Sequence, residues 1–350
     1  MISSLRLRNF RSYSDASFEF EPGVNIVVGP NASGKTNLLE AILFLASGGS
    51  YRVRDIDLIK FGKQWARLDS NFDKNQRVIK LKLENEKLQK NFELDTKTYK
   101  RLGLDRTIPA VLFEPNHLQL VSRGPGQRRD YFDDILGRSL PGFKKLSASY
   151  RRALAQRNAL LKQSPDRAAK QLFAWNVRLS QLGSQIVESR IKLLEDINQV
   201  ITKSYSQIAG KKSQAGLVYE SPIKSPNYSS RLLSKLEDSV PKDFERGFTA
   251  YGPHREDIAI ILNGQPANIS ASRGEVRSLL LALKIFELGL LEKVRIARPL
   301  FLLDDVFSEL DGARRKHLVE HLKNYQTIIT TTDAEAVIEY FSGKHNLLSL

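Results

Sequence analysis

The stretch VNIVVGPNASGKTNLLEA, at residues 24–41, limits the possible folds of this chain more than any other part of its sequence. Its first five residues are mostly β-branched and predict a buried strand, and the apolar residues among 38–43 predict a helix. Between them lies G-x-x-x-x-G-K-[ST], the phosphate-binding loop, in the strand–loop–helix context that this motif requires. A glycine turn that merely caps a helix is the alternative, but it does not account for the whole pattern. The chain is therefore predicted to bind a nucleoside triphosphate.

The residues of this loop have distinct predicted roles. Glycines let backbone N–H groups turn toward phosphate oxygens, and the start of the helix adds the positive end of its dipole. Lys35 can reach the β- and γ-phosphates, and the Thr36 hydroxyl can ligate Mg²⁺. The predicted nucleotide-binding residues of the loop are Gly29, Pro30, Asn31, Ala32, Ser33, Gly34, Lys35 and Thr36.

A second apolar strand, at residues 299–303, ends in the carboxylates of Asp304 and Asp305. Asp304 is predicted to hold Mg²⁺ directly or through water, and Asp305 to orient or deprotonate the attacking water. Two acids after a strand could instead form a turn and a helix cap, but a phosphate-binding loop requires a partner acid. Upstream, Ser272 and Gly274 open a long apolar helix and predict a second anion-binding helix terminus.

The composition of the chain limits the cellular compartment and the kinds of binding partner that can be expected. The 350 residues include 54 lysines and arginines and 39 acidic residues, which gives a net charge of +15. Such an excess favours a polyanion, with nucleic acid ahead of a membrane surface, although a generic basic charge is an alternative. The chain has no cysteine, no apolar run of roughly 20 residues and no signal-peptide pattern at its N-terminus. We therefore expect a cytoplasmic protein without a membrane partner.

Helical periodicity dominates residues 128–208, which we predict to form a helical hairpin similar to a short antiparallel coiled coil. Residues 128–212 contain 17 lysines and arginines against 7 acidic residues, a net charge of +10. The outer face of a coiled coil is usually only solvated, but the dominance of one sign favours an arm that follows DNA phosphates. Arg128 and Arg129 could instead brace the root of the arm. The predicted DNA contacts are Arg128, Arg129, Arg151, Arg152 and Arg157.

These patterns predict an α/β fold in four segments. Residues 1–125 form the first part of an ATPase head, which includes an antiparallel strand lobe between residues 65 and 94. Residues 126–212 form the inserted helical arm, 213–247 a connecting loop region with one short helix, and 248–350 the rest of the head.

The order of these motifs resembles the ABC-type ATPase heads of the SMC family. A closer resemblance is to the RecF family of bacterial recombination mediators, and it covers nearly the whole chain. Asn116 departs from it, since the family usually has an acid there, and residues 273–276 stand where a glutamine-rich signature is usual. The matching stretches are LRNFRSY at 7–13, GPNASGKT at 29–36, PNHLQLVSRGPGQRRDYFDD at 115–134, GPHRED at 252–257, SRGEVR at 272–277 and LLDDVFSELDGARRKHL at 302–318.

The resemblance implies an ABC-type head that forms an ATP-dependent homodimer around two ATP molecules. Each ATP would be held by the phosphate-binding loop of one subunit and by Ser272 and Gly274 of the other. It also implies a very slow, DNA-stimulated ATPase that binds DNA largely independently of sequence. The implied biology is DNA replication, repair of DNA damage and the SOS response, with mediator proteins that help to load a recombinase at single-strand gaps.

Three other classes of protein remain open alternatives. A transporter-type ATP-binding subunit would dock on a membrane partner and usually has two glycines where this chain has Arg273 and Gly274. A structural SMC-like ATPase would need a much longer coiled coil as a tether. An ATPase-linked nuclease would need a separate acidic cluster for a second metal centre. Stimulation of ATP hydrolysis by DNA, and not by membranes, would separate the first alternative from a DNA-binding protein.

Overall fold

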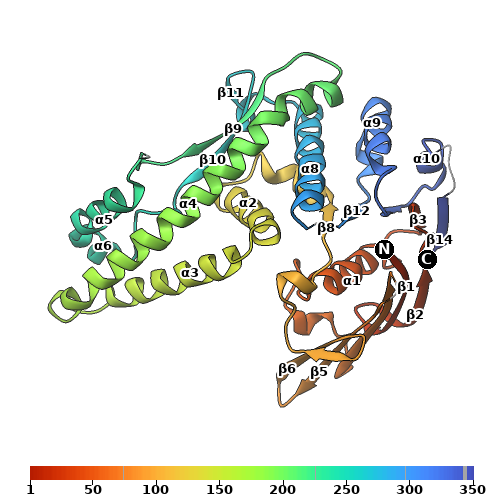
Figure 1. Cartoon of the computed structure of the whole chain (residues 1–350), viewed down its shortest axis with the longest axis horizontal. Coiled ribbons are helices and arrows are strands. Elements are labelled where there is room, and N and C mark those ends of the chain that lie inside the picture. Colours follow the sequence, from red (N-terminus) through yellow and green to blue (C-terminus); the bar gives the residue numbers. More distant parts are fainter. Residues whose placement is uncertain (74, 225, 296, 342–344) are drawn as a thin grey trace. The chain divides into compact units, whose positions relative to one another are not determined.

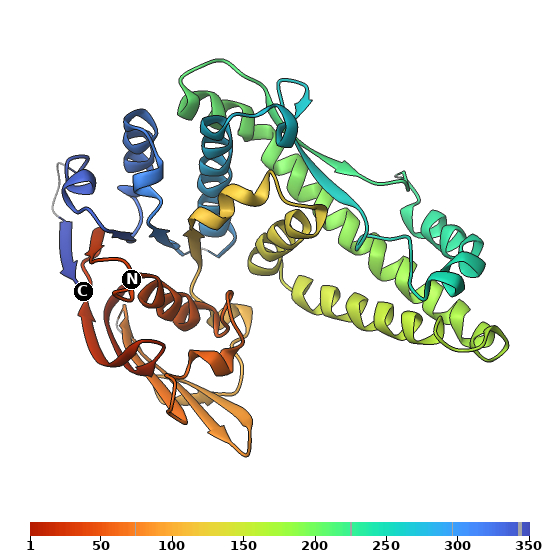
Figure 2. The same cartoon turned by 180° about the vertical axis from the view of Figure 1, so that it is seen from behind.

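The computed structural model describes residues 1–73, 75–224, 226–295, 297–341 and 345–350. The chain forms two compact units, each assembled from segments that are distant in the sequence (Figures 1 and 2). The first unit comprises Met1–His117, Ile208–Gly210 and Leu280–Leu350, and the second comprises Leu118–Gln207 and Lys211–Leu279. Among the described residues, no helix is both long enough and apolar enough to cross a bilayer.

The first unit contains a parallel five-stranded sheet that includes the strand predicted at residues 24–28 (Figure 1). Four of its strands are buried along almost their whole length, so their sequences are rich in apolar and β-branched residues and do not alternate between apolar and polar. All neighbouring strands are parallel, so their carboxyl ends meet at one edge of the sheet. In sheet order the strands are β14 (His345–Ser349), β3 (Val24–Val28), β13 (Thr327–Thr331), β12 (Leu300–Asp304) and β8 (Ala110–Phe113).

A six-stranded antiparallel sheet shares an apolar core with the parallel sheet and with helix α1 (Lys35–Ser47). The strands predicted between residues 65 and 94 are confirmed as its central meander. Asn85 and Glu86 connect two of them with positive φ angles of 49° and 62°, as a two-residue type I′ turn requires. In sheet order the strands are β2 (Tyr13–Glu19), β1 (Ile2–Phe10), β4 (Trp65–Phe72), β5 (Asn75–Glu84), β6 (Lys87–Leu94) and β7 (Lys97–Tyr99).

Helices and single turns complete the first unit. Helix α1 packs on β12 and β13, which places its N-terminus at the carboxyl edge of the parallel sheet. Three elements run from one unit into the other: α8 (Arg273–Arg295), the turn η3 (Pro115–Leu120) and the last residues of α4 (Pro165–Ala209). The remaining elements of the first unit are η1 (Asp55–Leu58), η2 (Leu104–Arg106), η4 (Phe307–Glu309), α9 (Gly312–Leu322) and α10 (Glu335–Ile338).

The second unit is a helical arm built around one very long helix, α4 (Pro165–Ala209) (Figures 1 and 2). The predicted hairpin is formed by α4 and α3 (Phe143–Leu160), joined through a small apolar core that includes Leu160 and Leu172. A separate helix, α2 (Pro125–Ser139), precedes them. The other elements are β9 (Ala215–Glu220), α5 (Tyr228–Asp238), α6 (Val240–Arg246), β10 (Asp257–Leu262), β11 (Gln265–Pro266) and α7 (Ala267–Ser270).

The segment 213–247 was expected to be a connecting loop region with one short helix. That helix is present as α5, but the segment also contains β9 and α6, which were not expected. The buried residues of α5 are Tyr228, Leu232 and Leu236, which are spaced four positions apart. Most of the residues between them are serines or charged residues, so the apolar stripe of this helix is narrow. Pro241 occupies the first turn of α6, where a helix tolerates proline because that N–H has no partner within the helix.

The apolar stripe of α4 also differs from the seven-residue repeat that is typical of a coiled coil, the structure to which the predicted hairpin was compared. Val200 continues that spacing but is 42% exposed, whereas Ile197, Ile201 and Tyr205 are buried. A straight α-helix has 3.6 residues per turn, so a strict repeat of 3.5 drifts around its surface over successive turns. The buried face of α4 therefore follows steps of four residues toward its C-terminus.

A row of polar side chains on α4 covers the outer edge of β9. Each side chain hydrogen-bonds both the N–H and the C=O of one residue of β9 or of the segment just before it, at distances of 2.7–3.3 Å. Four residues of helix rise about 6.0 Å and two residues of strand about 6.7 Å, so the two rows stay in register. The row thus satisfies edge groups that another strand could otherwise pair with. The pairs are Asn198 with Leu217, Thr202 with Ala215, and Ser206 with Ser213.

Candidate nucleotide site and basic surface

The predicted phosphate-binding loop lies at the carboxyl edge of the parallel sheet, between β3 and α1. Gly34 caps α1 with a φ of 108°, a left-handed conformation that favours glycine. A Cβ atom on Gly34 would lie 2.9 Å from the Tyr13 hydroxyl, and one on Gly29 would lie 2.6 Å from Ser33 Oγ. Both glycines of the motif are therefore required by the close approach of neighbouring atoms.

Lys35 directs its ammonium into the loop. Its Nζ donates hydrogen bonds to the carbonyl oxygens of Gly29, at 2.6 Å, and Pro30, at 2.8 Å. The residue is buried, with 7% of its surface exposed. An ammonium held in this position is surrounded by oxygen acceptors, and phosphate oxygens are stronger acceptors of the same kind.

Thr36 and Asp304 are 268 residues apart in sequence and meet at this edge. Thr36 Oγ1 donates to Asp304 Oδ1 at 3.2 Å, and Thr330 Oγ1 donates to the same carboxylate oxygen at 2.8 Å. A hydroxyl and a carboxylate are ligands of the kind that Mg²⁺ prefers, and Mg²⁺ commonly takes one or two carboxylates together with substrate phosphates and water. Within the part of the chain that the structure describes, no three His, Cys, Asp or Glu side chains form a metal cluster. Thr36 and Asp304 thus fit a cation that is completed by phosphate.

Asp305 has an unusual backbone for a non-glycine residue, with a φ of 52°. Its N–H donates to both the carbonyl and the hydroxyl oxygen of Thr330, at 3.2 and 3.1 Å, which holds this conformation. Burial raises the pKa of the Asp305 carboxyl, and Asp304 and Glu309 raise it further, while Lys35 opposes the rise. Such a carboxylate binds a proton more readily than an exposed one.

Two side chains at this edge were not predicted from the sequence as site residues. Glu114 follows β8 and is only 8% exposed, and the pairing of Phe113 with Leu303 places it beside Asp304. Burial raises the pKa of Glu114, and the charge of Asp304 adds to this effect. Tyr51 donates from its hydroxyl to Glu114 at 3.3 Å. A carboxylate at the end of a buried strand, the signal used for Asp304, would have found Glu114 but not Tyr51.

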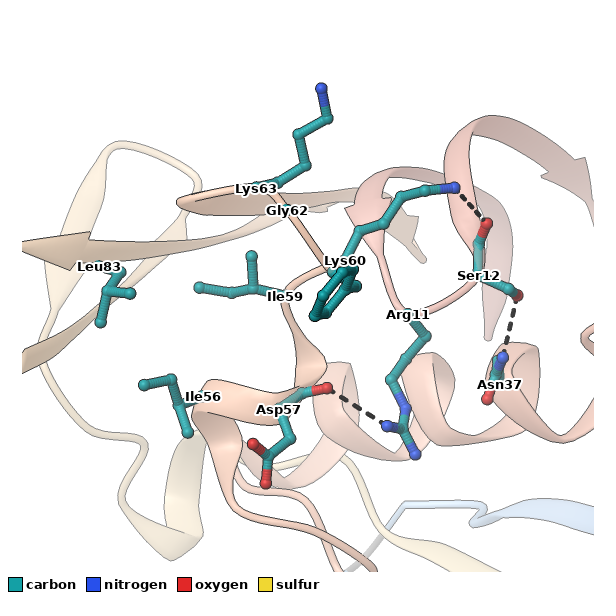
Figure 3. Close-up of a pocket in the computed structure, with 11 residues that line it drawn as sticks. Arg11, Ser12, Asn37, Ile56, Asp57, Ile59, Lys60, Gly62, Lys63 and Leu83 are labelled. Carbon is teal, nitrogen blue, oxygen red and sulfur yellow. Dashed lines mark hydrogen bonds between the residues drawn. The ribbon is translucent and has the colours of Figure 1, made fainter. Parts of the chain in front are cut away.

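A pocket of about 600 Å³ begins beside the start of α1 (Figure 3). Near the loop it is polar, since Asn37 donates to Ser12 Oγ at 2.9 Å and Lys60 donates to the carbonyl of Ser12 at 2.7 Å. Arg11 forms part of its wall and is held by a 2.8 Å ion pair with the buried Glu40. The opposite wall is apolar and contains Ile56, Ile59 and Leu83 (Figure 3). Phe61 also lines the pocket.

The predicted anion-binding residues Ser272 and Gly274 lie in the second unit, at the start of α8. Ser272 and Glu275 form a capping box, because Ser272 donates from N and Oγ to Glu275 Oε2 and accepts from the Glu275 N–H. The ion pair with Lys211, together with these bonds, lowers the pKa of Glu275 to about 2. Ser272 remains exposed at the N-terminus of a 23-residue helix.

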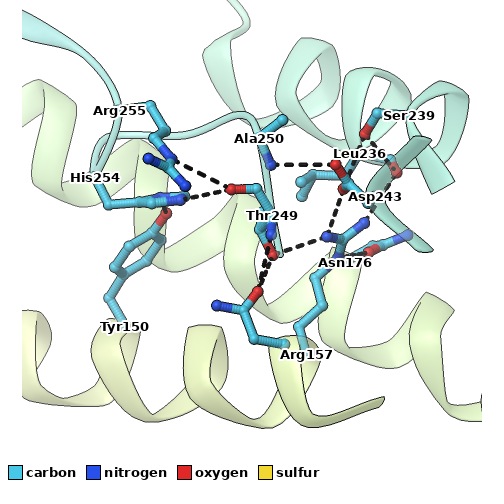
Figure 4. Close-up of polar contacts among 11 residues, drawn as sticks. Tyr150, Arg157, Asn176, Leu236, Ser239, Asp243, Thr249, Ala250, His254 and Arg255 are labelled. Atoms are coloured by element: carbon cyan, nitrogen blue, oxygen red, sulfur yellow. Dashed lines mark hydrogen bonds and ion pairs between the residues drawn. The ribbon is translucent and has the colours of Figure 1, made fainter. Parts of the chain in front are cut away.

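Arg157 was predicted to contact DNA, and the structure contradicts this because none of its surface is exposed (Figure 4). Its guanidinium donates to the Asp243 carboxylate at 2.7 Å and to Thr249 Oγ1 at 2.8 Å. It also donates to Asn176 Oδ1 at 2.7 Å and to the Leu236 carbonyl at 3.2 Å. Arg157 is therefore an internal cross-link between α3, α4, α5 and α6.

The other four predicted DNA contacts divide into two groups. Arg128 is buried in a bidentate ion pair with Asp257, and Arg129 is half-buried and donates to the Glu256 carbonyl at 2.6 Å. Both residues therefore brace the arm internally, which is the alternative role that the sequence left open for them. The prediction that Arg128 contacts DNA phosphate is wrong, because its guanidinium is bound to Asp257 inside the protein. Arg151 and Arg152 are exposed on α3. Their contact with DNA stays a prediction.

The GPHRED stretch at 252–257 forms a second buried polar network. His254 Nδ1 shares a 2.7 Å hydrogen bond with the Tyr150 hydroxyl, and burial lowers the pKa of His254 to about 4 (Figure 4). The Glu256 carboxylate accepts hydrogen bonds from three hydroxyl groups. This stretch therefore joins α3 to β9 and α5 through internal contacts. The three donors are Tyr219, Ser221 and Tyr228.

Comparison with known proteins agrees on one family. The family model of the RecF/RecN/SMC N-terminal domain matches residues 1–344. The chain is 35% identical to the DNA replication and repair protein RecF of Heliobacterium modesticaldum, with 96% of this chain and 93% of the relative covered. It is 37% identical to the protein of the same name from Tropheryma whipplei, with 95% and 92% covered.

Solved structures give the same result. The structure of the recombination mediator protein RecF-ATP in the RecFOR pathway superposes with a TM-score of 0.84 at 28% identity, covering 95% of this chain and 92% of that one. The corresponding RecF-ATPrS structure has a TM-score of 0.86 at 28% identity, covering 96% and 94%. The Smc head domain of Pyrococcus furiosus has a TM-score of 0.51 at 19% identity, covering 97% and 91%, and supports the fold alone. The predicted α/β head with an antiparallel lobe and a helical arm is confirmed.

Replacing Arg157 by leucine should lower the free energy of unfolding of the arm by about 3–5 kcal/mol, because Asp243 would stay buried without a cation. Urea denaturation combined with hydrogen exchange of α3 amides would measure this change. The exposed Arg152→Leu is the matched control and should change stability by no more than about 0.5 kcal/mol. Equal stability of the two variants would contradict the role of Arg157 as an internal cross-link.

Proposed function

The chain belongs to the RecF family, and from this premise we propose that it is an ATP-dependent DNA-binding protein of recombinational repair and replication. The contact between Thr36 and Asp304 carries the proposal, because it joins the phosphate-binding loop to its partner acid. The first unit would act as the ATPase head and the second unit as the DNA-binding arm. The segment 248–350, expected to belong to the head as a whole, is divided, because its residues up to Leu279 belong to the second unit. By family resemblance the protein would help mediator partners to load a recombinase at single-strand gaps.

ATP would be held mainly by the loop residues 29–36. Lys35 would exchange the carbonyl oxygens that it now contacts for β- and γ-phosphate oxygens. Thr36 and Asp304 would hold Mg²⁺, which when bound neutralises charge on the phosphates. Asp305 would orient or deprotonate the attacking water, and its raised pKa favours proton acceptance. Glu114, beside Asp304, would help to position the same water.

The pocket beside α1 would receive the nucleoside end of ATP. Its polar end, at Ser12 and Asn37, adjoins the phosphate-binding loop, as the ribose end of a nucleotide requires. Its apolar wall suits the faces of a base, and Phe61 is fully exposed there and free to cover it.

Two subunits would share each ATP, with Ser272 and Gly274 of one subunit facing the γ-phosphate held by the other. The exposed hydroxyl of Ser272 and the dipole of the long helix α8 support this reading. The alternative of an SMC-like structural tether is disfavoured by size. At 45 residues, α4 is only about 68 Å long.

Lys35→Ala should bind ATP at least about tenfold more weakly than the parent, because the variant cannot form charge-assisted hydrogen bonds to the phosphates. Titration with a fluorescent ATP analogue would measure the affinity. Lys82→Ala, which removes an exposed lysine from β5, is the control and should bind like the parent. An unchanged affinity for Lys35→Ala would overturn the nucleotide site.

Asp305→Asn should bind ATP like the parent but hydrolyse it about 100-fold more slowly, because the amide cannot accept the proton of water. Dimers should then accumulate with ATP, since the ligand that stabilises them is no longer removed. Phosphate release and light scattering after gel filtration would report the two effects. In Asp304→Asn, by contrast, the affinity for ATP should no longer depend on Mg²⁺. A normal rate in Asp305→Asn would exclude its catalytic role.

Reversing the charge of Arg151 and Arg152 to glutamate should weaken DNA binding to all sequences and leave ATP affinity unchanged. The slope of log K against log salt should become shallower by about 0.9 for each DNA phosphate that the protein no longer neutralises, or roughly 2 in all. The control reverses Lys192 and Lys203, two exposed lysines of α4, and changes net charge equally. Equal slopes for the parent and the Arg151/Arg152 variant would locate DNA binding elsewhere.

A further inference from the structure

Helix α9 carries two histidines whose ring nitrogens point at each other. His317 and His321 are four residues apart, so they lie one turn apart on the same face of the helix. Their Nε2 atoms are 3.2 Å apart, and the ring centroids are separated by 4.9 Å with the planes at 61°. Neither ring takes part in the nucleotide site proposed above.

The distance between the two nitrogens matches a metal chelate. Zinc–imidazole bonds are about 2.0–2.1 Å long in proteins. Two such bonds that end on nitrogens 3.2 Å apart enclose an angle of about 103° at the metal, close to the tetrahedral value. An ion could therefore bridge the two nitrogens in place of the proton that the rings now share.

The charge state of the rings suits a metal as well. Burial lowers the pKa of His317 and of His321, and for His321 the neighbouring His317 adds to this effect. The charge of the exposed Glu320 acts in the opposite direction on both. Metal ligands must be unprotonated, and neutral imidazoles bind without a large proton-release cost at neutral pH.

Glu320 stands between the two histidines in the sequence His-x-x-Glu-His, the spacing of one class of zinc-binding helices. No cluster of three His, Cys, Asp or Glu side chains is present in the described portion of the chain, so a bound ion keeps open positions for water. Imidazole ligands select zinc, nickel or copper ions over Mg²⁺. This site is therefore chemically different from the Thr36–Asp304 site.

We propose that α9 binds one divalent ion of the zinc class through His317 Nε2 and His321 Nε2. The ion closes one turn of α9, the helix that follows Asp304, Asp305 and the turn η4. Binding to the folded helix alone stabilises it. With half the ligands of a structural zinc site, the dissociation constant is on the order of 10 μM.

Isothermal titration of the full chain with Zn²⁺, in millimolar Mg²⁺ and without nucleotide, tests the proposal. We expect one zinc ion per chain, with the affinity reduced at least about tenfold in both His317→Asn and His321→Asn. The chain has only five histidines, so proton resonances of the imidazole rings can locate the ion. Two of the five ring signals should shift on addition of Zn²⁺.

Two controls keep the outcome clear. His345→Asn removes a histidine outside α9 and should leave zinc binding unchanged, as should Asp304→Asn, which alters the Mg²⁺ site. Far-UV circular dichroism would establish that each variant is folded. Absence of zinc binding in the parent would overturn the proposal. Binding that survives both α9 substitutions, or that disappears in Asp304→Asn, would also overturn it.

Discussion

The hydrogen bond between Thr36 and Asp304 is the contact on which the nucleotide site depends. It can form only because β3, β13 and β12 are adjacent and parallel, so that the ends of β3 and β12 face the same edge. Thr330, at the end of the intervening strand, donates to the same carboxylate and holds the Asp305 backbone. A change in the order or direction of these strands would separate the cation ligands, whatever the motifs on each strand.

The second unit depends in a similar way on one buried ion pair, between Arg157 and Asp243. Arg157 and Asp243 are both fully buried, so each needs the other, and the surrounding amide and hydroxyl groups satisfy the remaining hydrogen-bonding positions. Near the turn that joins α3 and α4, a small apolar cluster includes Leu160 and Leu172. We interpret the polar network as the feature that selects one arrangement of the helices, since apolar residues alone pack in several ways.

Internal ion pairs also reduce the positive charge that the arm can offer to DNA. The net charge of +10 between residues 128 and 212 counts every arginine as available to DNA. Arg128 and Arg157 are neutralised by Asp257 and Asp243, which lie outside that range, and Arg190 is paired with Asp133 inside it. The positive surface is therefore smaller than the sequence count. On α3 its exposed cations include Arg151 and Arg152 as well as Lys144 and Lys145.

The sequence by itself determined the features that depend on local geometry. Glycines at 29 and 34, a buried strand before them and a helix after them define the loop, because the residues that form it are consecutive in sequence. The sequence likewise determined the meander at residues 65–94 and the two acids at the end of β12. Tertiary structure alone decided which arginines are buried, that residues 213–247 contain β9 and α6 besides the expected short helix, and that Glu114 lies beside Asp304. Such features depend on partners far away in the chain, and the energy of a charge is set by the partners and water around it.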